Sequence, residues 1–113
     1  MTKHFSPVVS VIIPNWNGAE HLPTCLDSLA AQTYPHVEVL VVDNASYDDS
    51  LEILRTYPWV WVLPQPANLG FTGACNVGLK AAGGAIRVLL NNDTEAAPDW
   101  PEAEGAAYAA HPE

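Results

Sequence analysis

The chain has 113 residues, 49% of them hydrophobic and 15% charged, a composition that predicts one packed globular domain and excludes a disordered chain. Thirteen acidic residues against four Lys and Arg give a net charge of −9. This excludes a nucleic-acid-binding surface, because such a surface needs clustered cations. Any phosphate on a ligand would therefore be neutralised by a metal ion or by backbone amides.

Neither cysteine has the flanking residues of a metal site. Cys25 and Cys75 lie in apolar, helical stretches without a Cys-x-x-Cys spacing, so we expect two small buried side chains in a reducing compartment. No apolar run has the length of a membrane span, and residues 1–5 lack the hydrophobic region of a signal peptide. We expect a cytoplasmic location, with the inner face of the cell membrane as the alternative for a full-length protein.

The first predicted strand, residues 8–13, is β-branched and almost continuously apolar, as expected in the middle of a sheet. Pro14 cannot donate a backbone hydrogen bond to a neighbouring strand and is predicted to end it. A polar loop with one aromatic side chain, Trp16, follows. The next residues predict a helix to about Gln32, whose apolar face is formed by Leu22, Cys25, Leu26 and Leu29.

A second buried strand is predicted at residues 37–42, and it ends in two polar residues, Asp43 and Asn44. Ser46 and Asp49 then have the spacing of a helix-capping box. The sequence therefore predicts a second helix soon after this strand.

Leu51 and Leu54 give that second helix an apolar stripe, and Pro58 is predicted to end it. A short strand follows at residues 60–63. Because Pro64 and Pro66 follow it, we expect it to lie at an edge of the sheet or to be brief.

The third predicted helix, from about residue 68 to residue 82, contains several glycines. Each costs roughly 1 kcal/mol relative to alanine, so something must approach this backbone closely. The glycines in question are Gly70, Gly73 and Gly78. One face of the helix is shared by Phe71, Cys75, Gly78 and Ala82. Gly83 and Gly84 are expected to cap its C-terminus.

The last predicted strand, residues 86–90, ends in a continuous apolar run, so we expect it to be buried on both faces. Asn91, Asn92 and Asp93 follow at its carboxyl end. The alternation of strands and helices predicts a parallel sheet between layers of helices. Beyond it, an alanine stripe predicts a weakly packed helix or a frayed end: Ala103, Ala106, Ala107 and Ala110.

Polar side chains follow the first, second and last predicted strands. Since the carboxyl ends of parallel strands lie on one edge of a sheet, we expect these side chains to line one cleft. In such a cleft Asp43 can accept from the imide N–H of uracil or thymine, Trp16 can stack on the base, and a cation at Asp93 can bridge two phosphates. The pattern predicts a site for a nucleoside diphosphate.

Each of these features has a simpler alternative. Asp43 could belong only to the turn before a helix, and Trp16 could cover the sheet edge as a hydrophobic lid. Asn68 and Gly70 could form a tight turn without a ligand. Residues 91–93 could be a polar loop, because a single carboxylate is a weak metal signature.

Four motifs stand in a characteristic order and spacing: VIIPNWN at residues 11–17, VVDNAS at 41–46, NLGF with NVGL within 68–79, and LLNNDT at 89–94. Together they resemble the nucleotide-sugar half of family 2 glycosyltransferases, and most closely the rhamnosyltransferase-like members. The resemblance runs from about residue 8 to residue 100. It implies a GT-A fold, a Rossmann-like three-layer α/β/α arrangement with a mainly parallel sheet. A UDP- or dTDP-linked donor sugar would lie over the carboxyl edge of that sheet.

The resemblance also implies roles for individual residues. Pro14 and Trp16 would border the base, and Asp43 would hold its imide. The implied nucleotide-binding set is Pro14, Asn15, Trp16, Asn17, Asp43, Asn44, Asn68, Gly70, Asn76 and Asn92. Asp93 matches the metal-binding acid of an Asp-x-Asp motif that takes Mg²⁺ or Mn²⁺. Asn91 stands in place of the first acid of that motif, which lowers the negative charge that the protein offers to the metal.

For the reaction, the resemblance implies inverting transfer to a saccharide or lipid-linked acceptor, with the general base in a later half of the protein. We therefore expect residues 1–113 to be the donor-binding part of a longer chain. Alone, these residues are expected to bind nucleotide sugar weakly and not to transfer the sugar. Uncovered apolar surface and a free sheet edge would favour self-association.

Three other functions are weighed against this one. A non-catalytic nucleotide-binding module could keep the same fold. A sugar nucleotidyltransferase is expected to carry a glycine-rich loop with a basic residue after the first strand, and a Rossmann dehydrogenase a G-x-G-x-x-G motif. The sequence has neither feature at that place.

Overall fold

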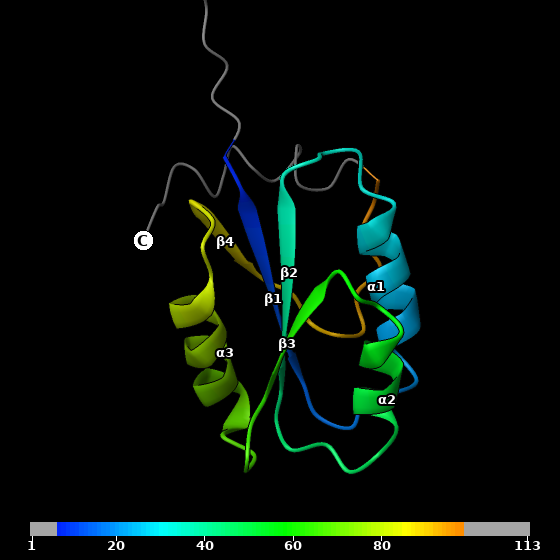
Figure 1. The fold of residues 1–113 in the computed structure, drawn as a ribbon, viewed down its shortest axis with the longest axis vertical. Helices are drawn as coiled ribbons and strands as arrows, with labels where there is room; N and C mark the ends of the chain where they lie inside the picture. Colours follow the sequence, from blue (N-terminus) through cyan, green and yellow to red (C-terminus); the bar gives the residue numbers. More distant parts are fainter. Residues whose placement is uncertain (1–6, 99–113) are drawn as a thin grey trace, which may run out of the picture.

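The computed structural model describes residues 7–98, and the structural statements that follow concern those residues. Four parallel strands form one sheet in the order β3-β2-β1-β4 (Figure 1). The elements are β1 (Val9–Asn15), α1 (Leu22–Ala30), β2 (Val37–Asp43), α2 (Ser50–Arg55), β3 (Val60–Pro64), α3 (Gly70–Ala81) and β4 (Ile86–Leu89). The predicted parallel sheet is confirmed, and β3 lies at an edge as expected.

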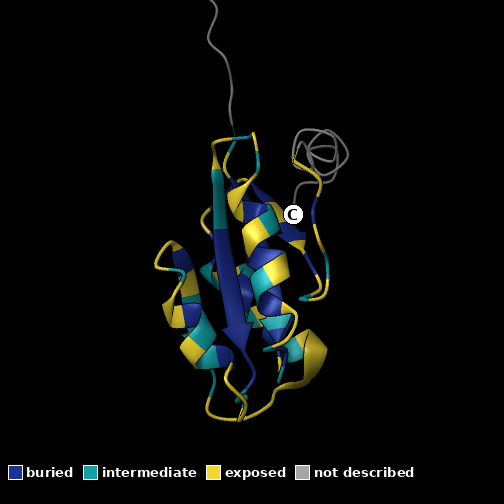
Figure 2. Cartoon of the chain, turned by 90° about the vertical axis from the view of Figure 1, so that its right-hand side faces the viewer, coloured by how far each residue is buried: buried dark blue, intermediate teal, exposed yellow. Residues whose placement is uncertain are grey.

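The sheet is the middle one of three layers, with α1 and α2 on one face and α3 on the other (Figure 1). Buried residues are concentrated in the strands (Figure 2). The core on the α1 side includes Val9, Val11, Ile13, Leu22, Cys25, Leu26, Leu29 and Leu54. The core on the α3 side includes Ile12, Leu40, Val42, Ala74 and Ala82. The alternation of β1 between these two cores explains why its sequence is apolar throughout.

β1 continues through Pro14 and pairs with β2 as far as Asn15, opposite Asp43. The backbone of Ile12 faces β4, because its carbonyl accepts from the N–H of Leu90 at 2.9 Å. Pro14, two residues further along, faces the same way. β4 pairs with β1 only as far as Ile12, so Pro14 lies beyond the last paired residue on that side and the observed β1–β4 pairing requires no hydrogen bond from it. The prediction that Pro14 ends the strand is therefore wrong.

α3 packs closely on the sheet at one of its glycines. A Cβ added to Gly78 would lie 2.3 Å from Cγ2 of Ile12 in β1, so the close approach predicted at this helix comes from the sheet. Cys75 and Ala82 are buried on the same side, but Phe71 is 60% exposed. Gly70 has φ +76 and begins the helix in a conformation that L side chains rarely adopt.

The ends of the helices differ from the predictions in small ways. α1 ends at Ala30, before Gln32. α2 begins at Ser50 without a side-chain cap, because Ser46 bonds elsewhere and does not form the predicted capping box. Ala82, in extended conformation, caps α3 in place of the predicted glycines.

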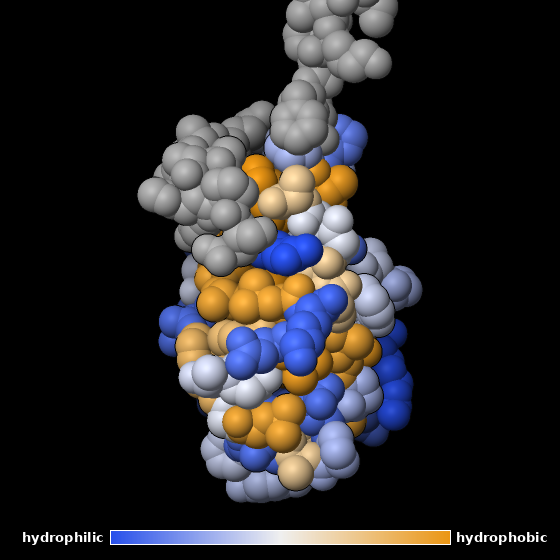
Figure 3. Space-filling model, turned by 90° about the vertical axis from the view of Figure 1, so that its left-hand side faces the viewer, coloured by the Kyte–Doolittle hydropathy of each residue, from blue (hydrophilic) through white to orange (hydrophobic). Residues whose placement is uncertain are grey.

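β4 is buried on one face only, so the prediction of burial on both faces is wrong. Ile86 and Val88 are buried, but Arg87 and Leu89 are exposed. The reason is that β4 lies at the edge of the sheet, and α3 packs on β1 and β2. Apolar surface is visible on the side of the molecule that carries α3 (Figure 3).

Two further predictions concern a C-terminal alanine stripe and the absence of a membrane-spanning segment. The alanine stripe from Ala103 to Ala110 lies outside the described residues. Within residues 7–98, no helix combines the length and the apolar character needed to cross a bilayer.

Candidate functional site

Hydrogen bonds join the carboxyl ends of the three strands that were predicted to converge. The side-chain nitrogen of Asn15, at the end of β1, donates to Oδ1 of Asp43, at the end of β2, over 3.0 Å. The side-chain nitrogen of Asn92, after β4, donates to Oδ1 of Asn15 over 2.8 Å. Asp43 and the segment that carries Asp93 therefore lie at the same edge of the sheet, and the predicted convergence is confirmed.

The loops after β1 and β2 are fixed to each other. The backbone N–H of Asn17 donates to Oγ of Ser46 at 2.9 Å, and the N–H of Tyr47 donates to the side-chain oxygen of Asn17 at 2.9 Å. The N–H of Ala19 reaches Asp48 at 3.1 Å. Burial acts to raise the pKa of Asp48, but hydrogen bonds to its carboxylate lower that pKa overall. The loop conformations at this edge are thus held by side-chain to backbone bonds.

Asp43 is fully buried and satisfied within the protein. Its Oδ1 accepts from Asn15 and from Oγ of Ser46 (2.7 Å), and its Oδ2 accepts from the backbone N–H of Ser46 (3.0 Å). The carboxylate thus fixes the turn after β2, as one of the simpler alternatives expected. Its predicted contact with a base stays a prediction. The role of Ser46 was missed, although its spacing from Asp43 at a strand end is typical of such turns.

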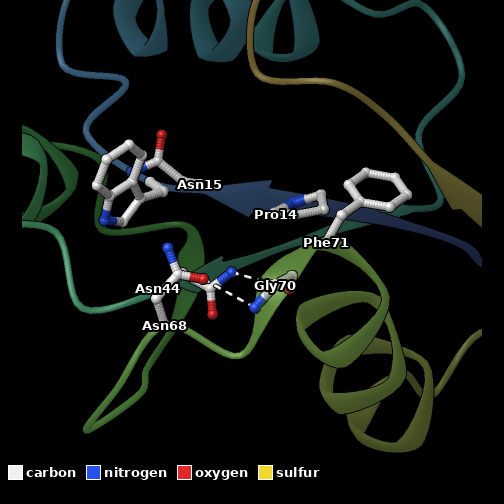
Figure 4. Close-up of a pocket in the computed structure, with 7 residues that line it drawn as sticks. Pro14, Asn15, Asn44, Asn68, Gly70 and Phe71 are labelled. Carbon is white, nitrogen blue, oxygen red and sulfur yellow. Dashed lines mark hydrogen bonds between the residues drawn. The ribbon is translucent and has the colours of Figure 1, made fainter.

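A hollow of about 250 Å³ opens beside these strand ends (Figure 4). It is lined by Pro14, Asn15, Trp16, Asn44, Asn68, Gly70 and Phe71. All of these except Phe71 belong to the predicted nucleotide-binding set. The sequence predicted Phe71 on the apolar face of the third helix. In the structure Phe71 lies in the first turn of α3 and lines the hollow.

The walls of the hollow are neutral and partly aromatic. Trp16 is 49% exposed and meets Tyr47 edge to face, with ring centroids 6.0 Å apart. No residue among those that line the hollow carries a charge. Flat aromatic and amide groups without charge suit a planar neutral ring such as a nucleobase.

Asn44 attaches the start of α3 to the end of β2. Its side-chain nitrogen donates to the carbonyl of Gly70 and its oxygen accepts from the N–H of Leu69, both at 3.1 Å. Asn68 accepts from the N–H of Gly70 at 2.8 Å. Asn68 and Gly70 therefore form the tight turn that was considered as an alternative, and they also line the hollow.

Residues 91–94 form a turn in which the N–H of Thr94 donates to the carbonyl of Asn91 at 3.1 Å. We call this segment the 91–94 turn. Asn91 and Asp93 are exposed, and Asn92 is partly buried. Burial, and secondarily the charge of Asp93, raises the pKa of the Cys25 thiol to about 11. Asp93 is therefore close enough to α1 for its charge to be felt there.

The chemistry of the 91–94 turn fits part of a site for a hard divalent cation. It offers one carboxylate and two amide side chains, and oxygen donors of this kind are preferred by Mg²⁺ and Mn²⁺. Within residues 7–98, no group of three or more His, Cys, Asp and Glu side chains could hold a metal ion. A cation at Asp93 would need further oxygen atoms, such as those of a diphosphate. Asn76, also in the predicted set, is exposed on α3 and does not line the hollow.

Comparison with known sequences identifies a family. Residues 10–111 match the family model for glycosyl transferase family 2. The chain is 39% identical over 102 residues to glycosyltransferase AglE of Haloferax volcanii, an alignment that covers 85% of this chain and 34% of that protein. It is 36% identical over 94 residues to the glycosyltransferase YibD of Escherichia coli K12, which covers 80% of this chain and 27% of that protein.

Solved structures show the same fold. Residues 1–349 of S. aureus TarS in complex with UDP match with a TM-score of 0.82 and 31% identity, covering 92% of this chain and 32% of that one. The mannosyltransferase PcManGT of Pyrobaculum calidifontis, in complex with GDP-Man and Mn²⁺, matches with a TM-score of 0.76 and 32% identity, covering 94% and 32%. The chain spans about a third of the length of such relatives. With its parallel sheet between helical layers, this chain has the GT-A fold and belongs to glycosyltransferase family 2.

Proposed function

We propose that this chain binds the nucleotide part of a sugar donor in the hollow at the carboxyl edge of the sheet. The observation that carries the proposal is the chain of hydrogen bonds from Asp43 through Asn15 to Asn92, which places the hollow beside the 91–94 turn. A nucleoside diphosphate needs these two environments next to each other. The base requires a neutral, stacking wall, and the diphosphate requires a cation.

The base is proposed to stack on Trp16 and to lie against Pro14. Stacking of a base on an aromatic side chain contributes about 1–3 kcal/mol, and the indole of Trp16 is half exposed beside the hollow. The relatives support a nucleotide ligand, because S. aureus TarS is known in complex with UDP and with UDP-GlcNAc. We propose a UDP- or dTDP-linked sugar as the donor, with a hexose or rhamnose as the sugar.

The diphosphate is proposed to share a Mg²⁺ or Mn²⁺ ion with Asp93, with Asn91 as a second protein ligand. This chain has only four Lys and Arg in a total charge of −9, and none of them lines the hollow. A divalent cation supplies the charge that stabilises a departing diphosphate when the sugar–phosphate bond breaks. Asp93 and Asn91 would hold that charge beside the nucleotide.

The sugar is proposed to pass, with inversion, to a hydroxyl of a saccharide or lipid-linked acceptor. Such an attack requires a general base close to the hydroxyl. We propose that this base lies outside residues 1–113, and that these residues are the donor-binding part of the enzyme. The chain alone is then expected to bind donor weakly and to transfer no sugar.

Isothermal titration calorimetry tests the binding site. We expect UDP or dTDP and their sugars to bind in the presence of Mn²⁺, and binding to weaken when the metal is chelated. Asp93→Asn should remove most of the metal effect, whereas Glu95→Gln, at an exposed acid two residues away, should keep it. Absence of binding by any nucleotide with Mn²⁺ would contradict the proposal, and sugar transfer by the chain alone would contradict the placement of the base.

A further inference from the structure

The side chain of Asn15 lies at the centre of the joined strand ends, and every hydrogen-bonding group of its amide is used. It is 1% exposed. Its nitrogen donates to Asp43 at 3.0 Å and to Oγ of Ser46 at 3.4 Å. Its oxygen accepts from Asn92 at 2.8 Å. Asn15 therefore connects a buried carboxylate on one side with the 91–94 turn on the other.

The chemistry of Asp43 determines which way round this amide is placed. The carboxylate oxygen next to Asn15 accepts hydrogen bonds, so Asn15 must present its nitrogen to it. The oxygen of Asn15 then faces the opposite side. Since that oxygen can only accept, Asn92 must present its nitrogen inward.

The consequence for Asn92 is that its side-chain oxygen faces away from Asn15. Among residues 7–98, no group donates a hydrogen bond to this oxygen, and the residue is partly exposed. The next residue is Asp93, the one acid of the 91–94 turn. An amide oxygen beside a carboxylate attracts a hard cation, whereas an amide N–H₂ in the same place would repel it.

We propose that Asn15 is a positioning residue that orients the amide of Asn92 so that its oxygen is available to a divalent cation at Asp93. The proposal rests on the proposed function, because the cation is the one that would accompany a bound diphosphate. It adds Asn92 to the protein ligands of the cation. It also gives buried Asp43 a function at a distance, since its carboxylate sets the orientation of both amides.

A substitution at Gly18 can break the hydrogen bond between Asn92 and Asn15 while keeping both side-chain amides. A Cβ at position 18 would lie 2.2 Å from the side-chain nitrogen of Asn92 and 2.4 Å from Oδ1 of Asn15. The φ of Gly18 is outside the range that excludes L side chains, so alanine is acceptable to the backbone. Gly18→Ala is therefore expected to displace the side chain of Asn92 and break its hydrogen bond to Asn15, without removing a polar group.

The experiment measures the affinity for UDP twice, once in saturating Mn²⁺ and once with the metal chelated. The ratio of these two affinities is called the metal enhancement. Binding of Mn²⁺ itself is followed in parallel by electron paramagnetic resonance. We expect Asn15→Ala, Asn92→Ala and Gly18→Ala each to lower the enhancement about 10-fold, as for other residues that orient a metal ligand. Asn15→Ala and Asn92→Ala combined should lower it no further, because both act on one oxygen. Thr24→Ala, at an exposed position on α1, is the control and should keep the full enhancement.

Folding is checked by thermal unfolding, because Asn15→Ala removes a donor from the buried Asp43. If that variant unfolds, Gly18→Ala and Asn92→Ala decide the question. An unchanged enhancement in these variants, with or without a loss of UDP affinity, would overturn the role of Asn15. UDP binding by the unaltered chain that is insensitive to Mn²⁺ would overturn it too, although the nucleotide site would stand. No UDP binding under either condition would contradict the proposed function itself.

Discussion

The side-chain amide of Asn92 donates to the side-chain oxygen of Asn15 across 2.8 Å, although the two residues lie 77 positions apart in the chain. One bond thereby attaches the 91–94 turn to the central strand of the sheet. If a base is bound in the hollow and a cation at Asp93, as we propose, this bond holds the two binding places next to each other.

The burial of Asp43 predicts a large loss of stability when its charge is removed. In Asp43→Asn, one of the two acceptors becomes an N–H₂ group that faces donors from Asn15 or Ser46. We expect the free energy of unfolding to fall by about 2–3 kcal/mol, the cost of leaving buried polar groups unpaired. Urea denaturation measures this. Asp49→Asn, at a helix start where no side-chain cap bond is made, should change it by less than about 0.5 kcal/mol, and equal effects of both substitutions would contradict the account.

Trp16 is predicted to contribute to nucleotide binding through stacking. Trp16→Ala should weaken UDP binding about 10-fold, within the range for loss of base stacking on an aromatic side chain. Trp61 is the matched control, because it is equally exposed, 50% against 49%, but lies on the edge strand β3. Trp61→Ala should leave the affinity measured by calorimetry unchanged. A loss of binding in both variants, or in neither, would count against the assigned hollow.

Gly78 is predicted to set the distance between α3 and the sheet. Gly78→Ala would place a Cβ 2.3 Å from Ile12, so the helix or the strand must move. We expect a destabilisation of about 1–3 kcal/mol, as for other overpacked sites. Gly83→Ala meets only an ordinary contact of 3.6 Å with Glu38 and should be close to neutral. The two midpoints of urea denaturation test the difference, and a stabilised Gly78→Ala would refute the packing argument.

The raised pKa of Cys25 predicts how the stability of the chain changes at alkaline pH, and it connects this thiol with Asp93, the proposed metal ligand. Burial, with the charge of Asp93 as the smaller cause, raises the pKa of this thiol from about 9 to about 11. The unfolded chain therefore releases the proton first as the pH rises. The stability that comes from the neutral thiol is fully present below pH 9 and is lost between pH 9 and about pH 11.

Alkylation of Cys25 as a function of pH measures this pKa, in a Cys75→Ser background so that one thiol reacts. Asp93→Asn should shift the profile to lower pH by a small amount, because burial remains the larger cause. UDP with Mn²⁺ should shift it in the same direction if the ion lies on Asp93. A profile that Asp93→Asn leaves in place would show that the two groups do not interact.

The sequence predicted the parallel sheet and the meeting of its polar strand ends, because both follow from local patterns. Continuous apolar runs indicate buried parallel strands, and the polar residues that end them, such as Asp43 and Asn92, must lie at one edge. The bonds between Asp43 and Ser46 could have been predicted, because their spacing at a strand end is typical of such turns. The bond to Asn15 was not predictable, because it depends on the orientation of an amide on another strand, and no spacing rule specifies that.

The errors at Pro14 and β4 have a common cause. Whether a proline breaks a strand, or an apolar strand is covered on both faces, depends on what lies beside it in space. Pro14 is tolerated because β4 has ended on that side, and Leu89 is exposed because α3 packs over β1 and β2. A sequence pattern indicates whether a residue is apolar or polar, but not how far the neighbouring strand or helix extends beside it.

Paramagnetic broadening by Mn²⁺ in a ¹⁵N-labelled sample tests most directly whether the cation of a bound nucleotide lies on Asp93. With UDP present, substoichiometric Mn²⁺ should broaden the amide signals of residues 91–94 and of Asn15 first, whereas those around Trp61 on β3 should stay sharp. Without UDP, the same amount of Mn²⁺ should broaden them less, because the diphosphate supplies the missing oxygen ligands. Broadening centred away from the 91–94 turn while UDP is bound would contradict the account.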